Sequence, residues 1–366
     1  MRALICVFFT AASVSAVFAQ DTGTPVAFGG RYSGAYRVAA FPAANSVVLR
    51  SGTSDPIPIA YDTVLLQGIL PDPGVTLEFS RQDGTGRWSA WRRVELKRRG
   101  SGRFWAKLRF PTVSTGKLRF RAVANGSGAA HKIQMFTIEV FTAGPRPPAG
   151  IRHGKTEQPV PPGPEIIGRA AWNAQPPKDE PVEQAPVRLT QHHTAGRQPF
   201  SLAESIEEVR FIQDFHQNGR GWSDIGYHFL LDGEGRIFEG RPKNVQGAHV
   251  RGANEGNIGI ALLGFYHPPY DNPVTPQQRA TLKALGRWLV GVYDIAPETY
   301  RGHRDLGKTD CPGDVLYSQL EAIRASFSAP SSSSAVSGFT AAPTIKGSEG
   351  AGGELFDGSV AGNRGK

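Results

Sequence analysis

The sequence has only two cysteines in 366 residues, and one of them, Cys6, lies in an apolar run at the N-terminus. Residues 1–19 have the form of a secretory signal peptide, with Arg2 near the start and small residues before Gln20. Removal of this peptide leaves Cys311 as the only thiol, which excludes an internal disulfide. We therefore expect export to the periplasm or to the extracellular space.

Long apolar runs are missing after this N-terminal stretch. No later segment approaches the roughly 20 apolar residues that a transmembrane helix needs, so no membrane span is expected. Internal repeats are missing as well. A chain of 366 residues has room for two domains, each large enough to bury its own core.

Acidic residues are scarce in the N-terminal part of the chain. Residues 20–145 contain 17 Lys and Arg but only 8 Asp and Glu, so this part carries a net charge of +9. Such an imbalance is typical of a surface that meets an anionic partner. In an exported protein we expect that partner to be an anionic cell-wall or envelope polymer rather than nucleic acid. A basic face that serves only solubility is the alternative.

Helical periodicity is absent from residues 20–142. Apolar residues alternate with polar ones instead, as at Val75, Leu77 and Phe79, which is the period of half-buried strands. We expect an all-β, sandwich-like domain here. Two tryptophans and four nearby arginines form either part of its core or a sugar- or wall-binding face: Trp88, Trp91, Arg92, Arg93, Arg98 and Arg99.

Proline is concentrated in residues 143–164, where seven of 22 positions are Pro and four are Gly. This composition predicts a semi-rigid linker. Residues 327–366 are rich in Ser, Ala and Gly and are expected to be disordered. Between these segments, residues 165–326 alternate strand and helix patterns, which predicts an α/β domain with a central mixed β-sheet flanked by helices.

Capping residues and periodicity locate the elements of this α/β domain. Ser201 and Glu204 form a capping box before an apolar helix face, and Pro276 opens a second helix after Thr275. A third helix is expected over residues 314–326. Strands are expected before His192 and over residues 224–231, 236–240 and 258–265.

The stretch from His303 to Cys311 places a histidine close to the single remaining thiol, and His192 offers a second imidazole. Zinc bound by two imidazoles and one thiolate keeps a fourth position open for water, as catalytic zinc sites do. A structural site would require a fourth protein ligand, and no second cysteine is near enough to supply it. An inert buried thiol is the alternative for Cys311.

Six separated motifs occur in one order within residues 165–326. They are Arg169-Ala-Ala-Trp172, His192-His193-Thr194, Gly221 to Phe229, Gly247-Ala-His249, Asn257-Ile-Gly259-Ile260 and His303 to Gly313. Together they resemble the peptidoglycan recognition protein and type-2 N-acetylmuramoyl-L-alanine amidase family, which includes the phage amidase lysozymes. The resemblance implies that fold for residues 165–326, with peptidoglycan or muropeptides as the partner.

The resemblance also implies roles for individual residues. The family's zinc ligands fall on His192, His303 and Cys311, and its active-site tyrosine falls on Tyr227. Bound zinc acidifies water and polarises a carbonyl oxygen, and Tyr227 is placed to hydrogen-bond the oxyanion. Thr309 stands where the amidase-active recognition proteins have threonine, and we assign it to orienting the water or the tetrahedral intermediate. Members that only bind peptidoglycan typically lack the cysteine.

We therefore expect an exported zinc-dependent amidase that cleaves the lactyl amide between N-acetylmuramic acid and L-alanine. Trp222, His249 and Asn257 are expected to contact substrate, with a structural role as an equal alternative for His249. A non-catalytic peptidoglycan-binding protein with a structural zinc is the main rival. A thiol nucleophile at Cys311 with a histidine base is the third hypothesis.

Overall fold

The computed structural model describes residues 23–31, 33–38, 47–126, 131–143 and 162–328. The expected signal peptide, most of the expected linker and nearly all of the C-terminal tail lie outside these residues. The described residues belong to one compact unit, Met1–Ala329. Among them, no helix combines the length and the apolar character that crossing a membrane requires.

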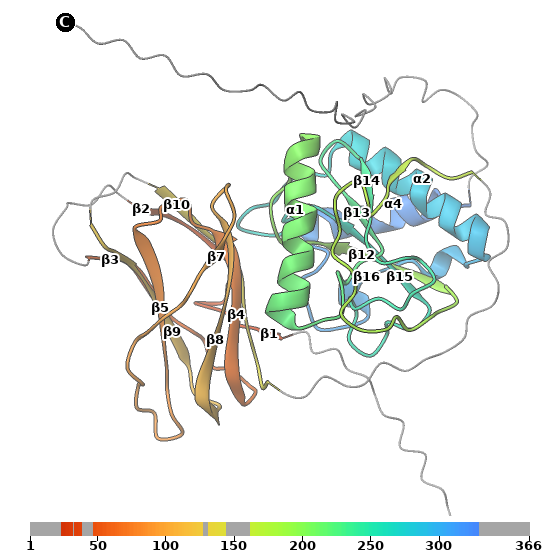
Figure 1. Ribbon diagram of the computed structural model, residues 1–366. Helices are drawn as coiled ribbons and strands as arrows, with labels where there is room; N and C mark the ends of the chain where they lie inside the picture. The colour runs from red at the N-terminus through yellow and green to blue at the C-terminus, as the bar shows by residue number, and fades with distance from the viewer. Residues whose placement is uncertain (1–22, 32, 39–46, 127–130, 144–161, 329–366) are drawn as a thin grey trace, which may run out of the picture. The chain divides into compact units, whose positions relative to one another are not determined.

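In the described part of residues 23–143, ten strands form two antiparallel sheets (Figure 1). One sheet has the order β1-β10-β4-β8-β7, with β2 also paired to β10, and the other has the order β3-β9-β5-β6. The strands are β1 (Thr24–Pro25), β2 (Gly34–Val38), β3 (Val47–Thr53), β4 (Tyr61–Ile69), β5 (Val75–Arg81), β6 (Arg92–Arg93), β7 (Lys97–Arg98), β8 (Arg103–Ser114), β9 (Leu118–Ala124) and β10 (His131–Phe141).

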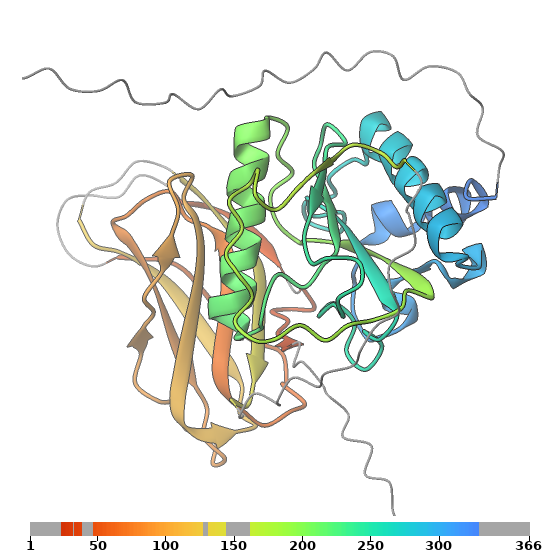
Figure 2. The ribbon, with the colours of Figure 1, turned by 45° about the vertical axis from the view of Figure 1, so that its right-hand side comes forward.

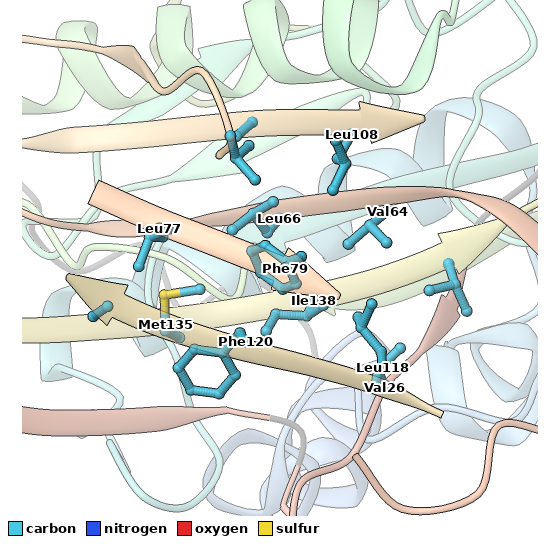
Figure 3. Packing of buried hydrophobic residues seen from close by; sticks show 14 of the residues in the cluster. Val26, Val64, Leu66, Leu77, Phe79, Leu108, Leu118, Phe120, Met135 and Ile138 are labelled. Atoms are coloured by element: carbon cyan, nitrogen blue, oxygen red, sulfur yellow. The ribbon is translucent and has the colours of Figure 1, made fainter. Parts of the chain in front are cut away.

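One hydrophobic cluster joins these two sheets. Leu77 and Phe79 of β5 point into it, and they meet Leu66 of β4 and Ile138 of β10 (Figure 3). The alternation of apolar and polar residues places one face of each strand in this cluster. Burial of this apolar surface is the main favourable contribution to folding of the region.

Strand β4 is buried on both of its faces. Val64 and Leu66 enter the cluster between the two sheets, whereas Leu65 enters another cluster together with Trp105 of β8 and Phe215 of the C-terminal region. Val64, Leu65 and Leu66 are three consecutive apolar residues of β4, and such a run is expected of a strand covered on both faces. The N-terminal strands and the C-terminal region therefore share a hydrophobic cluster.

The C-terminal region has a mixed sheet of six strands in its described part, in the order β11-β14-β13-β15-β12-β16. Neighbouring strands are parallel except for β13 and β14. This confirms the mixed sheet expected within residues 165–326. The strands are β11 (Ile166–Ile167), β12 (Arg188–His193), β13 (Phe229–Leu231), β14 (Ile237–Glu239), β15 (Asn257–Leu262) and β16 (Arg301–Gly302).

Helices cover both faces of this sheet. Helix α1 (Leu202–Asp214) lies on one face, and α2 (Pro276–Tyr293) and α4 (Leu320–Ala325) lie on the other, as the two views of Figures 1 and 2 show. Ser201 caps α1 and Thr275 caps α2, each in a capping box as expected. Short 3-10 turns, η2 (Pro297–Thr299) and η3 (His303–Asp305), flank β16.

Two expected elements are corrected. The helix expected over 314–326 is two helices, α3 (Asp314–Tyr317) and α4, because side chains of Ser318 and Gln319 donate to the carbonyl of Val315 and compete with helix continuation. The strand expected over 224–231 begins only at Phe229. Residues 224–228 form a loop whose backbone is held by side chains.

Candidate active site

The register of two parallel strands brings two histidines together. Strand β12 pairs with β16 so that Gln191 lies opposite Gly302. The residues that follow these two along the chain are His192 and His303. Their rings lie 4.6 Å apart, centroid to centroid. His192 lies near the carboxyl end of β12 and His303 directly follows that of β16, and the carboxyl ends of parallel strands are where α/β sheets commonly bind ligands.

Cys311 completes a compact group of donor atoms. Its Sγ lies 3.5 Å from Nδ1 of His192, and one donor atom from each of His192, His303 and Cys311 lies within 4.8 Å of the others. The backbone N–H of Cys311 donates to Oγ1 of Thr309 at 3.2 Å. Thr309 therefore holds the cysteine in place, a role that sequence reasoning did not assign to it.

A hydrogen-bond relay fixes the orientation of His192. Its Nε2 lies 3.0 Å from Nδ1 of His249, and Nε2 of His249 lies 3.0 Å from the carbonyl oxygen of Asn257. That carbonyl can only accept, so His249 donates from Nε2, accepts at Nδ1, and His192 donates from its own Nε2. The lone pair of His192 is thereby left on Nδ1, the atom that faces Cys311.

Two of the residues expected to contact substrate, His249 and Asn257, are engaged within the protein. His249 is buried and both of its ring nitrogens are engaged within the protein. Asn257 is fully buried, and its side chain bonds Thr190 and the carbonyl of Ala253. Glycine at position 259 of β15 leaves room for the His249 ring, since a Cβ there would lie 2.7 Å from that ring.

Burial keeps all three donor groups in their neutral forms. It lowers the pKa of His192 well below its usual value, with the neighbouring His303 adding to the effect, and it lowers the pKa of His303 to about 4. Burial raises the pKa of the Cys311 thiol to about 12. A buried thiol with a raised pKa is a poor free nucleophile, and a bound cation is what would ionise it.

This donor set fits zinc. Two neutral imidazoles and one sulfur are ligands that Zn²⁺ prefers, and three protein ligands are the number found at catalytic zinc sites. The fit rests on the proximity of His192, His303 and Cys311 and on the relay that aims Nδ1 of His192 at the group.

Tyr227 lies beside the donor group. Its ring centroid is 5.2 Å from that of His192, and the residue is half-buried. Burial raises the pKa of the phenol, and the negative charge that Cys311 carries when ionised raises it further. The hydroxyl therefore stays protonated near neutral pH and can donate a hydrogen bond.

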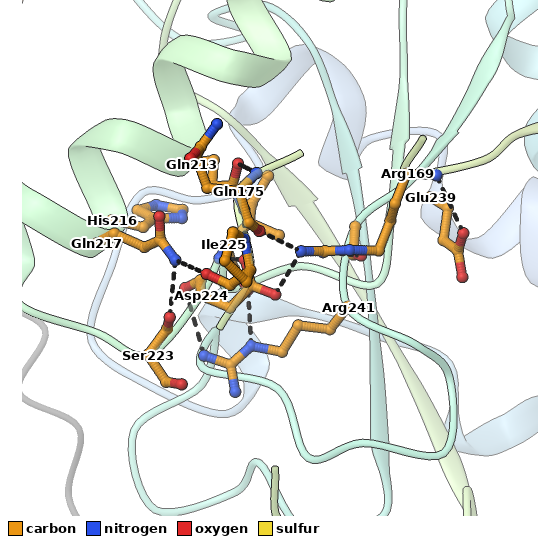
Figure 4. Close-up of polar contacts among 12 residues, drawn as sticks. Arg169, Gln175, Gln213, His216, Gln217, Ser223, Asp224, Ile225, Glu239 and Arg241 are labelled. Atoms are coloured by element: carbon orange, nitrogen blue, oxygen red, sulfur yellow. Dashed lines mark hydrogen bonds and ion pairs between the residues drawn. The ribbon is translucent and has the colours of Figure 1, made fainter. Parts of the chain in front are cut away.

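A network of buried polar side chains holds the loop before Tyr227 (Figure 4). Arg241 donates from Nε to the carbonyl of Ile225 at 2.7 Å and from Nη2 to the carbonyl of Asp224 at 3.3 Å. The Asp224 carboxylate accepts from Gln213 at 2.7 Å and pairs with Arg169 at 2.9 Å. Sequence reasoning quoted Arg169 in a motif but gave it no role, and it missed Asp224 and Arg241.

His216 and Trp222 pack behind the same loop. Nδ1 of His216 accepts from the N–H of Gly226 at 3.0 Å, and its ring lies 5.6 Å from that of Tyr227. Trp222 is buried and packs on His216 with the ring centroids 4.7 Å apart. The Trp222 ring therefore packs within the protein behind this loop, and a contact of this residue with substrate stays a prediction.

The remaining histidines near the sheet are structural. His193 is buried, its ring packs on Phe265 at 5.3 Å, and its Nδ1 accepts from the N–H of Tyr266. His228 accepts from the N–H of Gly259 at Nδ1 and lies 2.8 Å from the carbonyl of Val245 at Nε2. Neither ring belongs to the donor group.

The two tryptophans for which a core position and a binding face were the alternatives contact other arginines than those expected. Trp88 and Trp91 are half-buried and lie outside the described hydrophobic clusters. The guanidinium of Arg119 lies over both rings, 4.3 and 4.5 Å from their centroids, and that of Arg121 lies 4.5 Å from Trp91. Two of the expected arginines point elsewhere: Arg98 donates to the carbonyls of Leu70, Asp72 and Val75, and Arg99 pairs with Asp214.

Comparisons with known proteins identify close relatives of the C-terminal region. A family model described as N-acetylmuramoyl-L-alanine amidase matches residues 183–314, which include His192, Tyr227, His303 and Cys311. Peptidoglycan-recognition protein SC2 of Drosophila simulans is 38% identical over 130 residues, 35% of this chain and 69% of that protein. The N-acetylmuramoyl-L-alanine amidase of Homo sapiens is 34% identical over 162 residues, 43% of this chain and 28% of that protein. The crystal structure of Drosophila peptidoglycan recognition protein SD is similar over 44% of this chain and 94% of that chain, with 30% identity and a TM-score of 0.40.

Proposed function

Because this chain belongs to the peptidoglycan-recognition protein and type-2 N-acetylmuramoyl-L-alanine amidase family, we propose that it hydrolyses the amide bond between N-acetylmuramic acid and L-alanine of peptidoglycan. Membership alone supports either amidase activity or peptidoglycan recognition. The observation that favours the amidase is the complete donor group of His192, His303 and Cys311 within 4.8 Å.

The three donors would hold zinc, which supplies a coordination position for water and polarises the carbonyl oxygen of the scissile amide. His249 keeps the lone pair of His192 on the nitrogen that faces the group. Thr309 fixes the backbone of Cys311. These contacts keep the donor atoms in position before substrate arrives, which is the form of preorganisation that metal sites require.

Tyr227 acts on the substrate in this proposal. Attack of water on the lactyl carbonyl places negative charge on its oxygen, and the Tyr227 hydroxyl donates a hydrogen bond to that oxygen. The hydroxyl retains its proton because burial raises the pKa of the phenol. The loop network around Asp224 and Arg241 limits the positions that Tyr227 can take.

Mass spectrometry of purified sacculi after incubation with the mature protein tests the proposal. We expect free stem peptides that begin with L-alanine, lost on addition of a chelator and restored by zinc. Cys311→Ala should release none, since it removes one of the three donors. Tight binding to sacculi with no product under any metal condition would instead favour a recognition protein.

We also propose that the chain is exported and that its N-terminal region binds anionic cell-wall polymer. Support for the binding comes from the Trp88–Arg119–Trp91 stack and from Arg92 and Arg93, which follow Trp91 in the sequence and are exposed. Arginines held on aromatic rings keep their N–H edges for phosphate or carboxylate groups.

Retention of the full-length protein on purified cell walls tests this second proposal. We expect retention at low salt that falls as ionic strength rises. Arg92→Gln/Arg93→Gln should weaken retention, whereas Arg210→Gln/Lys283→Gln, which removes the same charge from the helices α1 and α2, should not. Equal losses in both variants would indicate a general charge effect without a defined face.

A further inference from the structure

The N-terminal region contributes a carboxylate to the segment that precedes Tyr227. Glu139 of β10 accepts two hydrogen bonds from Arg220, at 2.7 Å from Nη1 to Oε2 and at 2.6 Å from Nη2 to Oε1. The side chains of Arg220 and Glu139 are 11% and 9% exposed. A bidentate pair of this kind fixes the orientation of both groups as well as their charges.

Arg220 is the last residue of a π-helical turn, η1 (Phe215–Arg220), which continues from α1. Turns of this kind are rare and occur frequently at functional sites. Strand β4 packs closely against η1, because a Cβ at Gly219 would lie 3.2 Å from Cδ1 of Leu65. The turn is therefore held by the N-terminal strands through both apolar and ionic contacts.

An unbroken series of contacts leads from Arg220 to Tyr227. The guanidinium carbon of Arg220 lies 5.0 Å from the ring centroid of Trp222, and Trp222 packs on His216. His216 then accepts a hydrogen bond from the N–H of Gly226, the residue before Tyr227. A Cβ at Gly226 would lie 2.8 Å from the Trp222 ring, so the loop fits the tryptophan closely.

Loss of the charge on Glu139 would disturb this series at its start. Glu139 is the carboxylate that the structure pairs with Arg220, and Nε of Arg220 has no hydrogen-bond partner among the described residues. A buried guanidinium without a counter-ion is costly, so the side chain would turn toward solvent. Trp222 and the end of η1 would then lose a packing partner.

We propose that Glu139 is a positioning residue for the amidase: through Arg220 and Trp222 it holds the loop that carries Tyr227. The N-terminal region is then a working part of the active site, whether or not it also binds cell wall. The kinetic part of this inference rests on the proposed function, whereas its structural part does not.

Glu139→Gln in the full-length mature protein tests the inference by two measurements. Hydrogen exchange of peptides covering residues 215–228 should become at least about tenfold faster. On a soluble muropeptide, kcat should fall about tenfold with a smaller change in KM and with unchanged zinc content. Glu78→Gln is the matched control, because it removes the ion pair with Arg121 inside the N-terminal region, away from η1.

A second variant keeps the test decisive if Glu139→Gln folds poorly. Glu139→Gln/Arg220→Gln removes both buried charges, so it should recover stability while it keeps the fast exchange and the low kcat. Exchange and kcat equal to the unaltered protein in this double variant would overturn the inference, as would equal effects of Glu78→Gln. If exchange is fast in Glu139→Gln but the unaltered protein releases no product, the proposed amidase activity is refuted and the positioning role stays in place.

Discussion

Replacement of His249 by alanine is the sharpest test of how the donor group is organised. The substitution removes the acceptor that lies 3.0 Å from Nε2 of His192 and the donor that lies 3.0 Å from the carbonyl of Asn257. It also removes a ring that packs edge-on against His192 at 4.9 Å between centroids. His192 would then be free to rotate and to exchange the proton between its two nitrogens.

Loss of such an outer partner typically costs a factor of about 10 to 100 in metal affinity. We expect a decrease of this size for His249→Ala, equivalent to about 1.4 to 2.7 kcal/mol of binding free energy. Competition between the purified protein and a chromophoric chelator measures the zinc dissociation constant directly. The assay needs no substrate, so it is independent of the proposed reaction.

His193→Ala is the matched control for this experiment. His193 is buried beside His192 in the sequence, but its ring packs on Phe265 outside the donor group. Zinc affinity should therefore change by well under about tenfold in this variant, because the His193 ring makes no hydrogen bond to any of the three donor side chains. An unchanged affinity in His249→Ala, or an equal loss in His193→Ala, would refute the relay as the element that orients His192.

Three other measurements follow from the structure. Tyr227→Phe should lower kcat by a factor of about 10² to 10³ with unchanged zinc content, as removal of an oxyanion donor does, and steady-state kinetics would contradict this if kcat were retained. Glu208→Gln should lower the free energy of unfolding by about 3 to 5 kcal/mol in a urea titration, because Arg103 and Glu208 form an ion pair in which both side chains are 2% exposed; an unchanged midpoint would show that water reaches the pair. Burial lowers the pKa of His228 to about 4, below the value of about 6.5 in the unfolded chain. The free energy of unfolding of the protein kept metal-free by a chelator should therefore fall as the pH drops from about 6.5 toward 4, and His228→Gln should flatten that decline.

Local chemistry made several elements of the C-terminal region predictable. Ser201 and Thr275 begin α1 and α2 as their capping boxes indicate, because a cap is a contact between residues three positions apart. The alternation at Val75, Leu77 and Phe79 coincides with β5, because it too is a pattern between residues close in the sequence. The spacing of His303 and Cys311 also indicated a metal site, and the donor group contains both.

Contacts between distant segments were beyond the sequence patterns. The relay from Asn257 through His249 to His192 depends on the close approach of β15 to a loop, which no periodicity shows. The end of the helix pattern near Phe215 gave no sign of the π turn that places His216 against the loop before Tyr227. One signal was available and was not used: Val64, Leu65 and Leu66 are consecutive apolar residues of β4, which indicates a strand covered on both sides.

Glu139 lies outside the segment that the family model matches. The matched segment, residues 183–314, includes Arg220 and Tyr227 but begins well after β10, the strand that carries Glu139. Its donor group and relay lie wholly inside that segment, so zinc affinity should be insensitive to Glu139. The placement of Tyr227 depends on a charge that the segment does not carry. Zinc binding and turnover should therefore separate in this protein: Glu139→Gln should keep the first and lose much of the second, whereas His249→Ala should weaken both.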